Sequence, residues 1–150
     1  MEKIASFCID HNKLTEGIYV SRIDNDIITY DLRTRKPNND EYMDNITMHS
    51  FEHMFATYAR NSVLGENVIY FGPMGCQTGF YLLMRGVRDF ETLVLVKTVL
   101  QNIINHKGPI PGGKKSECGN FKNLSVAAAK IEARRYLKIL NSKENNFKYE

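Results

Sequence analysis

Alternation of apolar and polar positions predicts four strands arranged as two pairs. Apolar side chains recur at every second position of residues 28–33, which is the pattern of a strand with one buried face. The shorter apolar run 18–20 precedes it, and the acidic and amide residues 24–26 favour a turn, so we expect a hairpin. Residues 68–71 and 80–84 are two further apolar runs around a glycine-rich turn, and they predict a second pair.

Helical spacing predicts a first helix over residues 48–61. Phe51, Phe55 and Tyr58 are three or four positions apart and therefore form one apolar stripe. Thr47 stands directly before this segment, where a hydroxyl can accept a hydrogen bond from a free amide of the first turn. We expect Thr47 to be the N-cap of this helix.

Two more segments, 90–105 and 124–140, carry apolar residues at helical spacing. Residues 37–40 and 108–113 are rich in proline, glycine and asparagine, and they interrupt the regular structure. Hairpins separated by helices predict an α+β protein, with a mostly antiparallel sheet packed against helices in a single two-layer domain over residues 1–150.

The composition is that of an ordinary globular domain. With 150 residues, of which 43% are hydrophobic and 25% charged, the chain can form a core without disulfides. No apolar run approaches the roughly 18 residues of a membrane span, and residues 1–6 lack the order of a signal peptide, so we expect a cytoplasmic protein with no membrane partner. The net charge of +3 is small and Lys114 and Lys115 fit a solvated loop, so we expect no nucleic-acid partner.

Three cysteines are an odd number, which argues against a disulfide framework and favours thiol chemistry or metal ligation. Cys8 lies between Phe7 and Ile9, where we expect a small buried hydrophobic side chain. Cys76 lies in the glycine-rich turn 72–79, whose backbone allows a ligand to approach closely.

The pattern His49-x-x-Glu52-His53 is the inverted form of the zincin motif. Histidines four residues apart lie on one face of a helix, so both imidazoles can bind one cation while Glu52 acts as a base beside it. Cys118, in a loop before the last helix, is a natural third ligand because thiolates and imidazoles bind the same ions. Spacing alone leaves the identity of the metal open.

Two other functions fit the metal pattern taken alone. In an inverted-zincin peptidase, Glu52 would activate water on zinc, but that class takes a distant glutamate as third ligand and is built on much longer chains. In a non-enzymatic, metal-stabilised interaction module, a fourth protein ligand would close the site. His106 stands at a helix end and is a poor candidate for that ligand.

Longer motifs resemble the S-ribosylhomocysteine lyase (LuxS) family, which makes the precursor of autoinducer-2. They are, in the family's order, His-Ser-Phe-Glu-His-Met-Phe-Ala at 49–56, Gly-Pro-Met-Gly-Cys-Gln-Thr-Gly-Phe-Tyr at 72–81 and Glu-Cys-Gly-Asn at 117–120. Ser6-Phe7, Asp10-His11 and Asp31-Leu32-Arg33 also match the family's N-terminal pattern. The resemblance covers essentially the whole chain, and the motif around Cys76 is far more specific than the metal motif.

The resemblance implies cleavage of the thioether of S-ribosylhomocysteine to homocysteine and 4,5-dihydroxy-2,3-pentanedione, without an organic cofactor. The carbonyl of the opened sugar first migrates along the carbon chain through enediolates, which a divalent ion stabilises as a Lewis acid. By this resemblance His49, His53 and Cys118 bind one divalent transition metal per chain, with Fe(II) favoured and zinc or cobalt also accepted. Glu52 and Cys76 are then the acid–base pair, and a nearby cation stabilises a thiolate for that role.

The resemblance also implies a set of substrate-binding residues. Ser6, His11 and Arg33 match positions that line the substrate pocket, where a guanidinium can hold a carboxylate or a ribose hydroxyl. Gly119, directly after the metal cysteine, belongs to the same set.

Family members are homodimers with two active sites at the interface, so the resemblance implies a homodimer here. Phe7, Asp31 and Arg60 match positions that one subunit contributes to the pocket of its partner. Three places depart from the commoner family pattern, and at one of them Thr34-Arg35-Lys36 stands where another cysteine is common. Tyr70 stands where many members have an acidic residue, and Ser50 replaces a threonine in the metal motif without being a ligand.

Overall fold

One antiparallel sheet organises the structure. In the computed structural model, which describes residues 1–150, four strands pair in the order β1-β2-β4-β3. Their bounds are β1 Gly17–Asp24, β2 Ile27–Arg33, β3 Val68–Pro73 and β4 Gly79–Arg85. The β1/β2 and β3/β4 hairpins match the predicted pairs, and β2 joins them by pairing with β4, where Asp31 lies opposite Tyr81.

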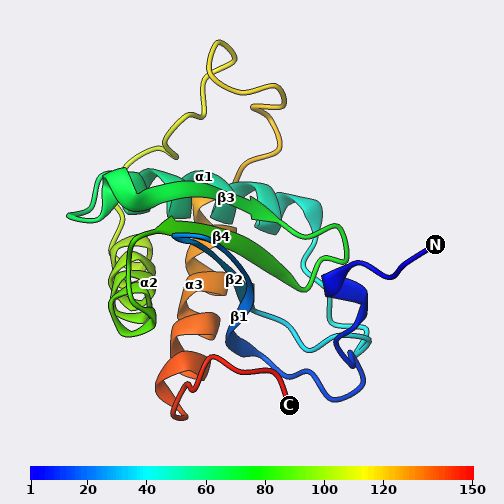
Figure 1. Cartoon of the computed structure of the whole chain (residues 1–150). Helices are drawn as coiled ribbons and strands as arrows, with labels where there is room; N and C mark the ends of the chain where they lie inside the picture. The colour runs from blue at the N-terminus through cyan, green and yellow to red at the C-terminus, as the bar shows by residue number, and fades with distance from the viewer.

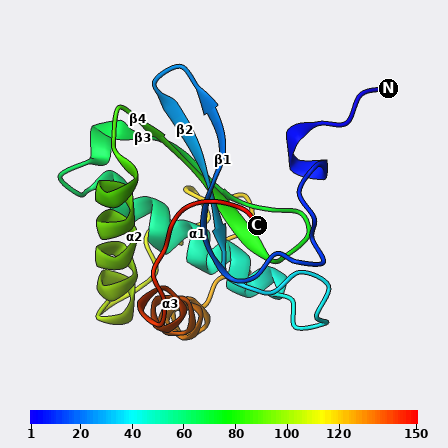
Figure 2. The ribbon, with the colours of Figure 1, turned by 60° about the horizontal axis from the view of Figure 1, so that its bottom comes forward.

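Three helices form the second layer and lie on the same side of the sheet (Figures 1 and 2). They are α1 Asn45–Arg60, α2 Asp89–Ile104 and α3 Val126–Asn141. Two short 3-10 turns, η1 Ala5–Phe7 and η2 Gly65–Asn67, complete the elements. The predicted two-layer α+β architecture is confirmed. None of the helices is long and apolar enough to cross a membrane.

A single hydrophobic core fills the space between the layers. Phe55 of α1 stacks on Phe71 of β3 with ring centroids 4.2 Å apart, and Phe71 stacks on Phe80 of β4 at 5.1 Å. Phe51 and Phe55 of the predicted stripe are fully buried, whereas Tyr58 is half-buried. Because two residues subtend about 200° around a helix, burial of Phe51 turns His49 to the opposite side of α1, away from the core.

Three local predictions are wrong. Asp44, not Thr47, caps α1: its carboxylate accepts from the amide of Thr47 at 2.7 Å, and a negative charge is also favoured at a helix N-terminus. The last helix begins two residues later than predicted, because the Ser125 hydroxyl accepts from the amide of Ala128 and sets the cap there. Cys8 is exposed rather than buried, since it follows the 3-10 turn η1, which contributes no residue to the core.

Buried polar contacts fix the irregular segment between β2 and α1. The Arg35 guanidinium makes two hydrogen bonds of 3.0 and 2.7 Å to the fully buried carboxylate of Glu132 on α3. Met43 exchanges hydrogen bonds with Gln77: the Met43 amide donates to the Gln77 carbonyl, and the Gln77 side-chain amide donates to the Met43 carbonyl. The β3–β4 turn that carries Cys76 is thereby attached to the chain just before α1.

Candidate active site

The structure brings together the three predicted metal ligands. His49 and His53 lie one turn apart on α1, and Cys118 comes from the long connection between α2 and α3, drawn in yellow and orange above α1 in Figure 1. The Cys118 sulfur lies 3.4 Å from Nε2 of His49 and 3.7 Å from Nε2 of His53. Typical metal–nitrogen and metal–sulfur bonds at a tetrahedral ion place such atoms about 3.5 Å apart, so the residues fit one transition metal.

Backbone carbonyls orient both imidazoles. Nδ1 of His49 lies 2.9 Å from the carbonyl oxygen of Asn123, and Nδ1 of His53 lies 2.9 Å from that of Pro111. A carbonyl can only accept, so Nδ1 of each ring carries the proton and Nε2 keeps its lone pair for a metal. The amide of Asn120 donates to the Cys118 sulfur at 3.4 Å, so the backbone of the loop also orients this side chain.

Further contacts hold the connecting loop over α1. The buried Ser50 hydroxyl accepts from the amide of Ser125 at 2.8 Å, which fixes the end of the loop against the helix. Gly112 adopts a left-handed conformation with φ +69°, and a Cβ there would lie 3.0 Å from Nδ1 of His53. Glycine is therefore required for the loop to approach the imidazole this closely. Lys114 and Lys115 are exposed in this loop, as predicted.

Glu52 lies beside the metal group. It is half-buried on α1 and lines a pocket of about 280 Å³ together with His49, Pro73, Asn120 and Asn123. The carboxylate is thus placed next to the cation site without belonging to the group of three ligand atoms that lie within 4.8 Å of one another. This position suits a base that acts on a molecule bound at the metal.

A second pocket, of about 320 Å³, contains Cys76 and four of the predicted substrate residues. The predicted residues that line it with Cys76 are Ser6, Phe7, His11 and Arg33. The last strand residue of β3, Pro73, lines both this pocket and that of Glu52, so the two pockets adjoin. Phe7 is 69% exposed at the rim of the Cys76 pocket, whereas Arg33 is almost completely buried.

Arg33 connects the thiol to a buried carboxylate. Its guanidinium donates to both oxygens of Asp31, at 3.1 and 2.6 Å, and donates through Nη1 to the Thr78 hydroxyl at 2.7 Å. The Thr78 oxygen lies 3.0 Å from the Cys76 sulfur, and Nη1 of Arg33 lies 3.8 Å from the same sulfur. A positive charge and a hydroxyl therefore face the Cys76 sulfur.

The remaining predicted residues lie outside these pockets in the single chain. Arg60 is exposed at the other end of α1, about 10 Å along the axis from His53, and its guanidinium donates to the carbonyls of Val68 and Ile69. Asp31 is buried and bonded within its own chain. Gly119 is exposed beside Cys118, with open space around its Cα.

Several groups that orient the site residues could not be identified from the local sequence. The carbonyls of Pro111 and Asn123 act through their backbone, and any residue has a carbonyl. Thr78 stands inside the motif around Cys76 but reads as a turn residue until its hydroxyl is placed between Arg33 and the sulfur. Tyr70 is 52% exposed and its ring lies over Gly72, near a separate pocket that it shares with Tyr81.

The fold and the site define a small α+β protein with a His–His–Cys group able to hold a metal. Next to this group lies a pocket in which the Arg33 guanidinium faces the Cys76 thiol. A family profile described as S-Ribosylhomocysteinase (LuxS) matches residues 4–147. The chain therefore belongs to this family, and it is a carbon–sulfur lyase. The resemblance seen in the sequence is confirmed, and a peptidase or a non-enzymatic module is set aside.

Curated relatives match this chain over nearly their full lengths. A protein of Borreliella burgdorferi (strain ZS7) named S-ribosylhomocysteine lyase is 47% identical over 156 residues, which cover 99% of both chains. Proteins of the same name from Finegoldia magna and Clostridium beijerinckii are 45% and 40% identical, over 97% and 99% of both chains.

Proposed function

We propose that this lyase cleaves the thioether of S-ribosylhomocysteine in a metal-dependent reaction that gives homocysteine and 4,5-dihydroxy-2,3-pentanedione. The names of the relatives supply the substrate. The supporting observation in the structure is that the pocket of Glu52, next to the ligand group, adjoins the pocket of Cys76 at Pro73. One elongated substrate can therefore meet a cation site, a carboxylate and a thiol at once.

The carbon–sulfur bond of the ribosyl group is not activated for elimination, because no carbonyl lies next to the carbon that must lose its proton. The sugar opens to an aldose, and its carbonyl moves along the chain until it lies next to the carbon whose proton is lost. Each move removes a proton from one carbon and returns a proton to the neighbouring one. In the last step a base takes a proton, a carbon–carbon double bond forms, and the carbon–sulfur bond breaks to release homocysteine thiolate.

The residues of the two pockets fit these steps. A divalent ion held by His49, His53 and Cys118 supplies a Lewis acid for negative charge that develops on substrate oxygens. Glu52 and Cys76 hold and move the protons, because each lines one of the two adjoining pockets and neither belongs to the ligand group. Arg33, beside Cys76, orients an anionic or hydroxyl-bearing part of the substrate.

Iron(II) is the metal we propose for the ligand set, with zinc and cobalt able to replace it. Two imidazoles and one thiolate suit several late first-row ions, so the proposal rests on the family resemblance rather than on the donor atoms. Three protein ligands leave a position for an oxygen of the substrate, and this is typical of catalytic rather than structural sites.

We also propose that the working unit is a homodimer. The face of the sheet opposite the helices carries half-buried or exposed side chains, among them Tyr70, Tyr81 and Leu83, together with a pocket of about 270 Å³. Phe7 and Ile4, in and before η1, add exposed apolar surface at 69% and 58% exposure. A second copy on this face would cover these groups and complete each site with Phe7 and Arg60 of its partner, whereas Asp31 is buried and bonded to Arg33 within its own chain.

Release of homocysteine tests the substrate. Purified protein loaded with iron(II) under anaerobic conditions is mixed with S-ribosylhomocysteine, and free thiol is followed with a chromogenic disulfide. We expect continuous release of one thiol per substrate consumed. Absence of thiol from metal-loaded, folded protein would contradict the proposed substrate.

Complementation tests the dimer. Cys76→Ala and Arg60→Ala proteins are each expected to be inactive, and refolding them together should restore activity in hybrid dimers that contain one intact site. The sedimentation coefficient of the wild type at micromolar concentration provides the control. A fully active monomer would defeat the proposal of a shared site.

A further inference from the structure

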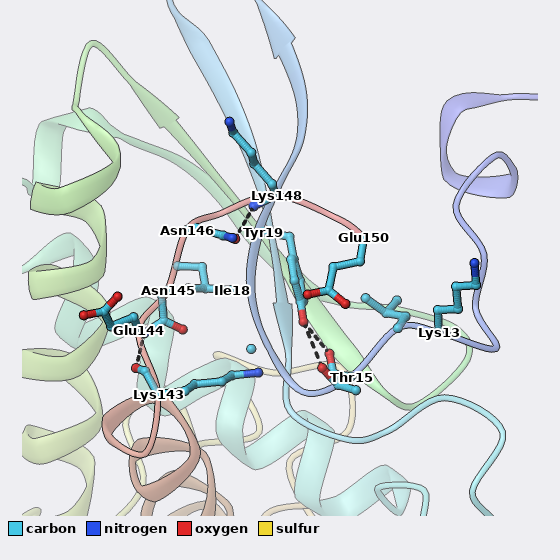
Figure 3. Close-up of a pocket in the computed structure, with 12 residues that line it drawn as sticks. Lys13, Thr15, Ile18, Tyr19, Lys143, Glu144, Asn145, Asn146, Lys148 and Glu150 are labelled. Atoms are coloured by element: carbon cyan, nitrogen blue, oxygen red, sulfur yellow. Dashed lines mark hydrogen bonds between the residues drawn. The ribbon is translucent and has the colours of Figure 1, made fainter.

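The last eight residues of the sequence, 143–150, form a segment that packs on strand β1 (Figures 2 and 3). We call residues 143–150 the closing segment. Its Phe147 carbonyl accepts from the amide of Val20 at 2.8 Å, and Phe147 forms a parallel bridge with Tyr19. The ring of Tyr149 stacks on that of Tyr19 with centroids 4.9 Å apart and an angle of 17° between the planes. Backbone and ring contacts thus fix the position of Tyr149 on the sheet.

The hydroxyl of Tyr149 reaches the carboxylate beneath the active site. It donates to Oδ2 of Asp31 at 2.7 Å, the same oxygen that accepts from Nη2 of Arg33 at 2.6 Å. Asp31 and Arg33 are only 1% and 3% exposed, so water cannot readily replace this donor. Burial first, and the Asp31 charge second, raise the pKa of Tyr149 far above its ordinary value, so the phenol keeps its proton.

From Asp31 the hydrogen bonds continue to the thiol. Arg33 donates through Nη1 to the Thr78 oxygen at 2.7 Å. Because that oxygen already accepts from the guanidinium, the one hydrogen of the Thr78 hydroxyl is free to point at the Cys76 sulfur, 3.0 Å away. The hydrogen bonds therefore form one chain from Tyr149 to Cys76. Tyr149 and Arg33 both donate to Asp31, and the Arg33 guanidinium and the Thr78 hydroxyl both face the Cys76 sulfur.

We propose that Tyr149 is a positioning residue for the active-site thiol, acting through Asp31, Arg33 and Thr78. Its hydroxyl takes up part of the charge of the Asp31 carboxylate and fixes its orientation. Without it, the carboxylate attracts the guanidinium more strongly, and Arg33 supports the Cys76 thiolate less. This inference rests on the proposed role of Cys76 as a proton carrier.

Two other titratable groups, Tyr81 and His11, line the same pocket as the Cys76 thiol. The Tyr81 phenol of β4 lines the Cys76 pocket, and burial followed by the Asp31 charge raises its pKa, so it stays neutral. The His11 imidazole, from the segment before β1, also lines the pocket, and its Nδ1 donates to the Ile9 carbonyl, 2.8 Å away. Both groups are unchanged by a substitution at Tyr149.

Alkylation of Cys76 by iodoacetamide tests the proposal in the metal-loaded protein. Rates are measured by peptide mass spectrometry from pH 5 to 9, and the exposed Cys8 in the same molecules serves as an internal reference. We expect Tyr149→Phe to slow alkylation of Cys76 at pH 7 about three- to tenfold and to move its pH profile to higher pH. This is the size expected when part of one hydrogen bond to a charged group is lost.

The matched control is Tyr19→Phe, which keeps the ring stack and removes a hydroxyl that bonds to Thr15 instead of Asp31 (Figure 3). We expect this variant to leave the Cys76 profile in place. The proposal is overturned if Tyr149→Phe matches the wild type at every pH, or if only Tyr149→Ala, which also removes the ring, changes the profile. Alkylation requires no substrate, so this result is independent of whether homocysteine is released.

Discussion

The two halves of the candidate active site are attached to the fold in different ways. The metal half consists of half-buried imidazoles on the outer face of α1, oriented by carbonyl groups of the loop between α2 and α3. The thiol half stands on strand β2 and the β3–β4 turn, where the buried pair of Asp31 and Arg33 supports Cys76. One half depends on backbone geometry of a loop, and the other depends on side chains that are part of the folded interior.

This difference predicts how each half fails. A change in the metal half alters metal affinity and leaves the core intact, because its residues do not belong to the buried cluster. In the thiol half, substitution of Arg33 removes the partner of the buried Asp31 charge, and the protein loses stability together with reactivity. The contributions of the two halves can therefore be distinguished by measuring metal content, turnover and unfolding for the same set of variants.

The largest effect is expected from loss of a ligand. Cys118→Ala removes the thiolate that lies close to both imidazoles, so bound metal should fall well below one equivalent after dialysis. Loss of a ligand exceeds the about 10–100-fold change in affinity typical of outer contacts. Metal is counted by mass spectrometry, with Cys8→Ala as the control because Cys8 is exposed and outside the group. A full equivalent in Cys118→Ala would remove Cys118 from the ligands.

Substitution of either proposed proton carrier should abolish most turnover while leaving the metal bound. Glu52→Gln and Cys76→Ala are each expected to lower kcat by about 10²–10⁴-fold, the usual contribution of a general acid or base. Because several proton transfers occur in sequence, we expect values at the upper end. Homocysteine release and metal content are measured on the same samples. Near wild-type release by Cys76→Ala would leave the cysteine as a turn residue.

In metal-free protein, substitutions in the two halves should lower the free energy of unfolding by different amounts. Arg33→Met leaves the Asp31 carboxylate buried without its main partner, and we expect a cost of about 3–5 kcal/mol. His49→Ala removes one hydrogen bond to a carbonyl at a half-buried site, with an expected cost of about 0.5–1.5 kcal/mol. Urea unfolding followed by circular dichroism gives both values. Equal costs would show that the two halves do not differ as we describe.

The smallest effect is expected from the loop itself. Gly112→Ala places a methyl group 3.0 Å from Nδ1 of His53 and should weaken metal binding about tenfold, as outer contacts commonly do. Gly108→Ala is matched for backbone strain, since Gly108 also has a positive φ of +95°, but its Cβ would meet nothing within 4 Å. Competition with a chromogenic chelator measures both affinities. If Gly108→Ala weakens binding as much, strain in the loop rather than contact with His53 is responsible.

Most of the fold follows from the hydrophobic pattern, because burial on one face of a strand or helix leaves a period in the sequence. The four strands, the three helices and the α+β class were predicted in this way. The N-cap of α1 is predicted wrongly, because Thr47 and Asp44 are both acceptable N-cap residues and only the structure shows which one bonds to the first turn. Cys8 was misplaced because its apolar neighbours resemble those of a strand.

The site was predicted less completely, for a physical reason. The proposed ligands and the proposed reactive cysteine stand in motifs, and the structure brings His49, His53 and Cys118 together as expected. The groups that orient them are backbone carbonyls or residues distant in sequence, such as Tyr149, which is 118 positions from Asp31. No local pattern encodes such contacts, because they arise only when the sheet and the closing segment are assembled.

Solvent deuterium in the recovered substrate tests most directly whether both halves act on one molecule. Metal-loaded Glu52→Gln and Cys76→Ala are incubated with S-ribosylhomocysteine in deuterium oxide, and the position of each label is read by carbon-13 NMR. We predict that both variants retain metal and that each exchanges protons at different carbons, because the carboxylate and the thiol stand in different pockets. Identical labelling by both variants, or labelling equal to that of the wild type in either one, would contradict this division of labour.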